Sequence, residues 1–293
     1  MQRSITITGF ERPKLFNQVV QDLAKCNPDG WHLFAGIEPS PSAAQFEEIC
    51  AAHLPEGSFT LWVNQTCLGV AQNPLQVQER AFEAGSELNL HLEEDLCLAP
   101  DSLQMVDWYQ QNRKPNWVAL NLLAGCCGTT AYMSYPDHPE LLTETRSFNS
   151  LGFAVDRESW HKVFHPVWSQ CWKHRWLKPR HLNAIGWDWA ISGAIFDAPD
   201  LRVVQPVSAR ASHLGATGTH AEPEFHSAAF DGLVINRQTP KSYQLVAREE
   251  LPRNVRSHFN SYEEATSLRA ELEARHPRKL ERRLKRVIAQ RFL

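Results

Sequence analysis

The chain has 293 residues, of which 43% are hydrophobic and 22% are charged. This composition is that of a globular protein with a substantial core, and it excludes a disordered chain. The longest apolar run, residues 117–127, is too short to span a bilayer, and the N-terminus enters a strand-like segment without a basic and apolar leader. We therefore expect a cytoplasmic protein whose seven cysteines, which lack metal-type pairing, are reduced and structural.

The formal net charge of −3 hides a basic C-terminal tail, because residues 275–291 contain eight Lys or Arg residues and one Glu. Pro277 divides this tail into two helices, and both carry apolar residues at helical spacing. A basic helix with an apolar stripe predicts peripheral contact with the inner face of an anionic membrane or with an acidic partner. The alternative is that the stripe packs on the domain while the arginines stay solvated. We expect no nucleic-acid partner.

The first hundred residues alternate between extended and helical patterns. Strand-like segments lie at residues 5–10, 31–37, 59–63 and 87–92. Helices are predicted to begin at Pro13, at Ser40-Pro41 and at Asn73-Pro74, and the third ends before Gly85. This alternation predicts an α/β fold with a mainly parallel sheet flanked by helices, whose strand carboxyl ends form the natural ligand crevice.

Further along the chain the pattern is mixed. Strand-like segments lie at residues 117–123, 151–155 and 201–207, and a turn-rich stretch to about residue 150 precedes the second of them. Residues 158–176 predict an aromatic-rich helical region. A loop-like stretch then carries His213, Gly215, Gly218 and His220.

Three adjacent carboxylates, Glu93, Glu94 and Asp95, interrupt an apolar run. The leucines at 88, 90 and 92 precede them, and those at 96 and 98 follow, which indicates two buried extended segments that meet at the triplet. Like charges packed at a strand end repel one another and are costly to desolvate. A divalent cation shared with a phosphate group would balance them. The alternative is a solvated acidic turn.

Three motifs follow one another along the chain: "EEDLCLAPD" at 93–101, "SLGF" at 150–153 and "WDW" at 187–189. With them the chain resembles the metal-dependent glycosyltransferases of the GT-A fold, most closely the N-acetylglucosaminyltransferases that add a β-1,2-linked residue to a mannose of N-glycans. That family carries a Glu-Asp-Asp triplet with a following "APD", a "GLGW" segment and a "WDDW" segment.

The similarity runs from about residue 3 to about residue 236. It implies a GT-A, Rossmann-like catalytic domain at 1–236, with a nucleotide-binding half at about 1–100 and an acceptor half at about 101–236. A C-terminal extension with basic helices, 237–293, would follow as a helical tail.

The resemblance implies an inverting enzyme that uses Mn²⁺ or Mg²⁺ to move a sugar such as GlcNAc from a UDP-sugar to an acceptor hydroxyl. Asp95 takes the position of the metal ligand, Glu94 lies near the ribose and Glu93 near the donor sugar, although the family has Asp where Glu94 stands. Asp188 takes the position of the catalytic base. The chemistry agrees, because an acceptor hydroxyl is a poor nucleophile until a carboxylate takes its proton. The alternative for Asp188 is a helix cap between buried tryptophans.

Further donor contacts are implied on the same basis. Phe10 and Arg12 follow the first strand, where a guanidinium can approach the diphosphate or the base. Glu38, after the second strand, stands where the family reads uracil, and Gly152 lets the backbone approach the sugar closely. The alternatives are solvent-facing strand ends for Arg12 and Glu38, and a simple turn for Gly152.

The late histidines are candidates for the metal or the diphosphate, because neutral imidazole suits either task. His213 is favoured over His220, since it directly follows a strand that returns to the crevice.

Two other functions stay open. A nucleotidyltransferase that makes nucleotide sugars needs a glycine-rich phosphate loop near the first strand, which "GFERPK" at 9–14 does not provide. A non-catalytic nucleotide-sugar-binding protein would lack a base, whereas Asp188 is present. The expected acceptor is a glycan or lipid-linked glycan on the cytoplasmic side, because the chain lacks the anchor and stem of the eukaryotic relatives.

Overall fold

The computed structural model describes residues 2–125, 129, 131–171, 186–216 and 223–275. Within these residues one large sheet has the strand order β11-β7-β9-β6-β8-β4-β1-β2-β3, and β10 pairs with β5 in a second, small sheet. The strands are β1 (Arg3–Gly9), β2 (Trp31–Ile37), β3 (Phe59–Val63), β4 (Leu88–Glu93), β5 (Leu96–Leu98), β6 (Trp117–Asn121), β7 (Leu141–Thr145), β8 (Phe153–Asp156), β9 (Arg202–Pro206), β10 (Ala211–His213) and β11 (Gln244–Val246). The helices are α1 (Pro13–Lys25), α2 (Ala43–His53), α3 (Gly69–Glu83), α4 (Ser102–Gln111), α5 (Arg157–Ser159), η1 (Trp160–Phe164), α6 (His165–Trp168), α7 (Trp187–Asp197), α8 (Pro223–Phe230), η3 (Arg248–Glu250) and α9 (Arg253–Arg275).

Four neighbouring strands, β3, β2, β1 and β4, form the parallel part of the sheet. They run in one direction because α1, α2 and α3 carry the chain back between successive strands, as parallel neighbours require. In this register Gly9 lies beside Ile37, and Thr8 lies beside Glu93. The carboxyl ends of β1, β2 and β4 therefore meet at one edge of the sheet.

The remaining strands mix directions. β8 lies antiparallel between β4 and β6, while β9 runs parallel to β6. β7 is antiparallel to β9, and β11 pairs with β7 in parallel. Since β1, β2, β3, β4, β6 and β9 share one direction, the predicted α/β fold with a mainly parallel sheet is confirmed.

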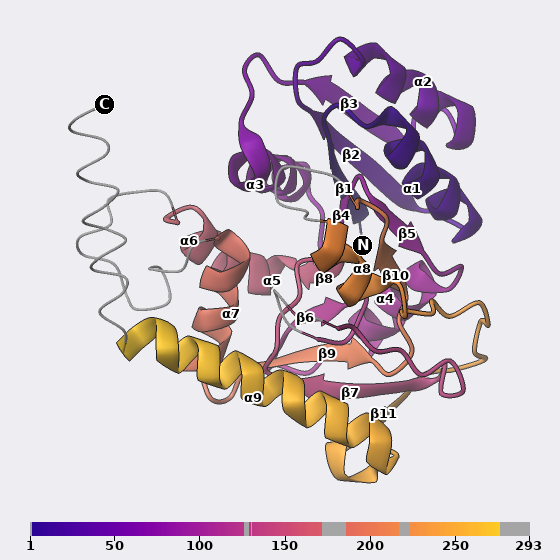
Figure 1. Ribbon diagram of the computed structural model, residues 1–293. Coiled ribbons are helices and arrows are strands. Elements are labelled where there is room, and N and C mark those ends of the chain that lie inside the picture. The colour runs from indigo at the N-terminus through magenta and orange to yellow at the C-terminus, as the bar shows by residue number, and fades with distance from the viewer. Residues whose placement is uncertain (1, 126–128, 130, 172–185, 217–222, 276–293) are drawn as a thin grey trace.

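Helices cover both faces of the large sheet (Figure 1). On one face Ile5 of β1 packs with Phe16 of α1 and Phe46 of α2 in the main hydrophobic cluster. On the other face Phe34 of β2 packs with Val77 of α3. The alternation follows from the strand geometry, since successive side chains point to opposite faces. A largely apolar strand such as β2 is therefore buried on both sides, apart from the half-buried His32.

The C-terminal segment begins as part of this sheet, because β11 pairs with β7. Helix α9 then runs alongside β7 and β9 (Figure 1) and contributes Val255 and Phe259 to a cluster with Val207 and Val246. The second tail helix and its membrane-binding face, predicted at 277–293, lie outside the described residues. None of the helices in the described ranges is long and apolar enough to cross a bilayer.

The start of α3 differs from the sequence-based prediction. The helix begins at Gly69, and Pro74 lies inside it. Proline lacks the N–H that would bind the carbonyl four residues earlier, which here belongs to Val70. The indole N–H of Trp187 donates to this carbonyl over 3.2 Å, so tertiary contact compensates for the proline.

Two other segments also differ. The turn-rich stretch before residue 150 contains strand β7, whose mixed sequence "LLTET" has no clear periodicity and is held by pairing with β9. The loop expected around His213 begins later, because His213 is the last residue of strand β10. Pairing partners that are distant in sequence decided both assignments.

Candidate metal and donor site

The acidic triplet lies at the carboxyl edge of the parallel strands. Glu93 ends β4, Glu94 and Asp95 form the following turn, and Leu96 starts β5. Strand β10 pairs antiparallel with β5 and places His213 opposite Leu96. The imidazole therefore comes to the triplet from a distant part of the chain.

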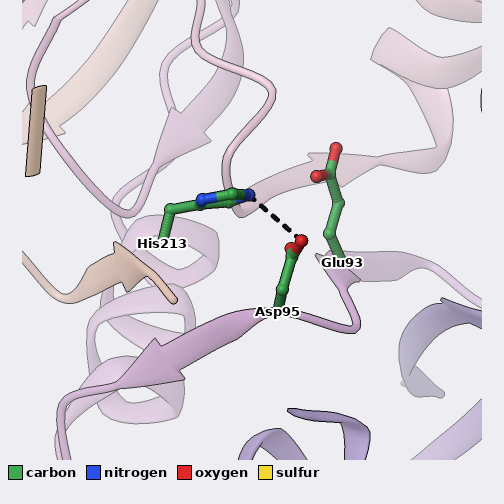
Figure 2. Close-up of side chains that lie close together, drawn as sticks. All are labelled: Glu93, Asp95 and His213. Carbon is green, nitrogen blue, oxygen red and sulfur yellow. Dashed lines mark ion pairs between the residues drawn. The ribbon is translucent and has the colours of Figure 1, made fainter. Parts of the chain in front are cut away.

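Three side chains converge at this point, as Figure 2 shows for Glu93, Asp95 and His213. Each offers one ligand atom, and these atoms lie within 4.8 Å of one another. His213 Nε2 lies 3.1 Å from Asp95 Oδ2. The other carboxylate oxygen of Asp95, Oδ1, is buried without a hydrogen-bond partner among the described residues. A buried oxygen that only accepts, beside a second carboxylate and an imidazole, fits a divalent cation such as Mn²⁺.

Arg12 is the counter-ion of the triplet. Its Nε donates to Glu94 Oε1 over 2.7 Å, and its Nη1 lies 2.8 Å from Asp95 Oδ2. The backbone N–H of Phe10 donates to the other oxygen of Glu94, Oε2, over 2.7 Å. Both Phe10 and Arg12 thus contact the triplet, and their predicted contacts with the donor stay a prediction.

The pKa values in the site shift in opposite directions. Desolvation raises the pKa of Glu93, and the charges of Asp95 and Asp188 add to it. Desolvation also raises the pKa of Asp95, but the hydrogen bond and charge of His213, together with Arg12, outweigh it and lower that pKa. Neighbouring carboxylates with separated pKa values are typical of functional sites.

Asp188 belongs to the same electrostatic environment, because its charge contributes to the raised pKa of Glu93. It lies in the first turn of α7, directly after Trp187. A Cβ atom added at Gly186 would lie 2.4 Å from Asp188 Oδ1, so the glycine leaves room for the carboxylate. Asp188 is therefore near enough for its charge to act on Glu93, and its role as a base stays a prediction.

Glu38 lies at the same edge, but its carboxylate binds protein groups. Its Oε1 accepts from the backbone N–H of Gly69 over 2.7 Å, and both oxygens accept from the N–H of Leu68. These groups belong to the start of α3, where a negative charge is favourable. Helix capping is therefore the observed role of Glu38, and uracil recognition stays a prediction.

Gly152 precedes β8, where Phe153 lies beside His91 of β4. Its φ is +78°, a value that favours glycine, and an added Cβ would lie 2.8 Å from Leu122 Cδ1. These features explain the glycine as a turn and packing residue near the carboxyl end of β4. His220, the less favoured histidine, lies outside the described residues.

Gly215 is a site residue that the sequence reasoning missed. A Cβ atom at this position would lie 2.4 Å from Asp95 Oδ2 and 2.9 Å from both Arg12 Nη1 and His213 Cε1. The backbone therefore covers the site so closely that no side chain fits. The only local signal was a glycine two residues after a candidate ligand, which is common in loops.

No protein-family model and no curated protein matches the sequence. The solved structure of the mannosyltransferase PcManGT from Pyrobaculum calidifontis, in complex with GDP-Man and Mn²⁺, has 13% identity and a TM-score of 0.48, with 70% of this chain and 54% of that chain covered. S. aureus TarS in complex with UDP-GlcNAc has 11% identity and a TM-score of 0.49, with 75% and 62% covered. A putative glucose-1-phosphate thymidylyltransferase from Bacillus anthracis has 13% identity and a TM-score of 0.41, with 81% and 98% covered.

This chain thus spans 54% of the length of PcManGT, 62% of that of the solved fragment TarS 1–349 and 36% of that of the longer TarS chain. At these identities and scores the likeness assigns no family and no residue role, and the chemistry of the site has to carry the function.

Proposed function

We propose that the protein is a metal-dependent glycosyltransferase that moves a sugar from a UDP-sugar to an acceptor hydroxyl. The observation that carries this proposal is the convergence of Glu93, Asp95 and His213 at the carboxyl edge of the sheet, with Asp188 in the same electrostatic environment. A cation site next to a separate carboxylate suits transfer from a diphosphate-linked sugar, because it can stabilise the leaving group and accept the proton of the acceptor.

Glu93, Asp95 and His213 would hold the cation, and a bound cation would offset the negative charge of the departing diphosphate. Arg12 adds a guanidinium at the same place, and its side chain is 33% exposed, so it can reach a ligand. Backbone around Phe10 and Gly152 lines the same edge. These groups would bind and orient the donor.

Asp188 would accept the proton of the acceptor hydroxyl as the oxygen attacks the anomeric carbon. A single displacement of this kind inverts the anomeric configuration. The first turn of α7 holds Asp188 on a rigid element, and the indole of Trp187 is tied to α3 by its hydrogen bond to Val70. Placing a general base on a fixed helix favours a defined geometry for proton transfer.

The finer assignment follows the motif resemblance. We propose GlcNAc as the first donor sugar to test, Mn²⁺ as the cation, and a glycan or lipid-linked glycan as the acceptor. A cytoplasmic location, with the basic tail at the inner face of the membrane, is part of the same proposal.

Hydrolysis of a panel of nucleotide sugars in the presence of Mn²⁺ tests the proposal. We expect release of UDP from one UDP-sugar, loss of this activity with a chelator, and, with an acceptor, NMR signals of the inverted anomer. Formation of a nucleotide sugar from a sugar 1-phosphate and UTP, without transfer, would instead identify a nucleotidyltransferase. Binding of UDP-sugar without turnover would identify a binding protein.

A further inference from the structure

We propose that Arg12 competes with the cation for Asp95, and that a diphosphate relieves this competition, so that cation and diphosphate bind cooperatively. This inference rests on the proposed function in one respect, namely that Glu93, Asp95 and His213 form a cation site beside a diphosphate. It concerns how two ligands of that site depend on each other.

The competition follows from the surroundings of one atom. Asp95 Oδ2 lies 2.8 Å from Arg12 Nη1 and 3.1 Å from His213 Nε2. The backbone at Gly215 closes a further side, since a Cβ there would lie 2.4 Å from the same oxygen. Oδ2 is therefore crowded, whereas Oδ1 has no partner among the described residues. A cation that binds both oxygens of Asp95 competes with the guanidinium for the lone pairs of Oδ2.

Electrostatic repulsion between Arg12 and a bound cation adds to this competition. A cation held by Glu93, Asp95 and His213 would stand close to the guanidinium of Arg12, and two positive charges at such a distance repel each other. Arg12 already balances part of the negative charge of the triplet through Glu94 and Asp95. Arg12 therefore lowers the affinity of the site for a cation that arrives without an anion.

A diphosphate reverses this effect. Its oxygens accept from a guanidinium in a bidentate manner, and they also ligate divalent cations. Arg12 is the N-cap residue of α1, where the positive end of the helix favours an anion. With 33% of its side chain exposed, Arg12 can turn from Asp95 toward such a ligand. Diphosphate binding then frees Asp95 Oδ2 and adds negative charge beside the cation.

Titration of the full-length protein with Mn²⁺ tests the proposal. Electron paramagnetic resonance measures the free Mn²⁺, so that binding with and without a diphosphate is compared at equal concentrations of free Mn²⁺. Inorganic pyrophosphate serves as the diphosphate, because it needs no uridine contact. For the wild type we expect pyrophosphate to tighten Mn²⁺ binding about tenfold or more. Arg12→Gln should bind Mn²⁺ alone about tenfold more tightly than the wild type, and pyrophosphate should then have little effect.

Two further variants make the result specific. Arg12→Lys keeps the positive charge and should bind Mn²⁺ alone more weakly than Arg12→Gln does. Arg3→Gln is the matched control, because Arg3 is also an ion-paired arginine, 2.8 Å from Asp107, and is about equally exposed, but lies at the other end of β1. It should behave like the wild type.

The proposal is wrong if Arg12→Gln binds Mn²⁺ alone no more tightly than the wild type, or if pyrophosphate tightens binding equally in both. Its failure is separable from that of the proposed function. If Mn²⁺ and pyrophosphate binding are coupled through Arg12 but no nucleotide sugar is cleaved, the inference holds and the proposed glycosyltransferase function is wrong. If a UDP-sugar is cleaved in a metal-dependent way but this coupling is absent, the proposed function holds and the inference is wrong.

Discussion

The indole rings of Trp168 and Trp187 lie parallel, with centroids 3.7 Å apart and an interplanar angle of 4°. Their N–H groups donate to successive carbonyls of α3, Trp168 to Ala71 over 2.9 Å and Trp187 to Val70 over 3.2 Å. The pair therefore connects α6 and α7 to the start of α3. Because Asp188 is the next residue after Trp187, this stack positions the first turn of α7.

Trp187→Phe should keep the aromatic ring but leave the Val70 carbonyl without its donor. Loss of this hydrogen bond should cost about 0.5–1.5 kcal/mol in the free energy of unfolding, which urea unfolding can measure. We also expect a lower kcat with little change in the donor KM, since Asp188 would lose its fixed position. Trp117→Phe is the control, because Trp117 likewise donates its indole N–H, to Glu144 over 2.7 Å. It should lower stability without this selective loss of kcat.

Asp95→Asn and Asp188→Asn should affect different steps. Asp95→Asn replaces a charged oxygen with an amide, so binding of Mn²⁺ should weaken and turnover should fall with it. Asp188→Asn keeps the shape but cannot accept a proton. Calorimetry should therefore show intact binding of Mn²⁺ and UDP, while transfer drops about 10²- to 10⁴-fold. Near-normal transfer by Asp188→Asn, or retained anomeric configuration, would remove Asp188 from the mechanism.

Gly215→Ala should weaken Mn²⁺ binding without changing any ligand. The added Cβ would overlap Asp95 Oδ2, so either the loop or the carboxylate must move. By analogy with changes beside metal ligands, we expect a loss of about tenfold to a hundredfold in metal affinity. Gly232→Ala is the matched control, since a Cβ there meets nothing within 4 Å. Equal Mn²⁺ affinities of the two variants would show that Gly215 has no part in the site.

The buried pair of Arg210 and Asp101 should be a stability determinant. Both side chains are 0% exposed, Arg210 Nε lies 2.8 Å from Asp101 Oδ2, and Tyr243 donates its hydroxyl to the same oxygen. Arg210→Met would leave a buried carboxylate without its counter-ion, at a cost of about 3–5 kcal/mol in the free energy of unfolding. Lys114→Met, which breaks a half-exposed pair with Glu144, should cost no more than about 1 kcal/mol.

The thiols should differ strongly in reactivity. Burial raises the pKa of Cys26 and of Cys50 to about 12, whereas Cys67 is exposed. Alkylation at pH 8, followed residue by residue with mass spectrometry, should modify Cys67 before Cys26 and Cys50, because only thiolates react. Comparable rates at Cys50 and Cys67 would contradict the burial of Cys50.

The same shift predicts how stability depends on pH. The ordinary pKa of a thiol is about 9, so above pH 9 the thiol of Cys50 loses its proton in the unfolded chain. In the folded protein the same thiol keeps its proton up to about pH 12. The free energy of unfolding should therefore decrease with rising pH in this window, by about 1.4 kcal/mol per pH unit and thiol. Cys50→Ala should show a shallower slope in urea unfolding at pH 9 to 11 than the wild type.

The sequence alone determined the parallel part of the fold. Residues 31–37 were predicted as a strand and form β2 with these bounds, because a largely apolar run is buried on both faces of a parallel sheet. The start of α1 at Pro13 was likewise predicted from a local signal. The position of the acidic triplet after β4 followed from the same patterns, since strand ends are set by neighbouring residues.

Only the tertiary structure decided how the site is assembled. His213 reaches Asp95 because β10 pairs with β5, and Gly215 covers the site as a result of that pairing. The hydrogen bond of Glu38 to the start of α3 at Gly69 was likewise not predicted, and base recognition by Glu38 stays a prediction. Local sequence patterns report on neighbours within a few residues, but these contacts join segments far apart in the chain. Their register depends on packing that no local pattern encodes.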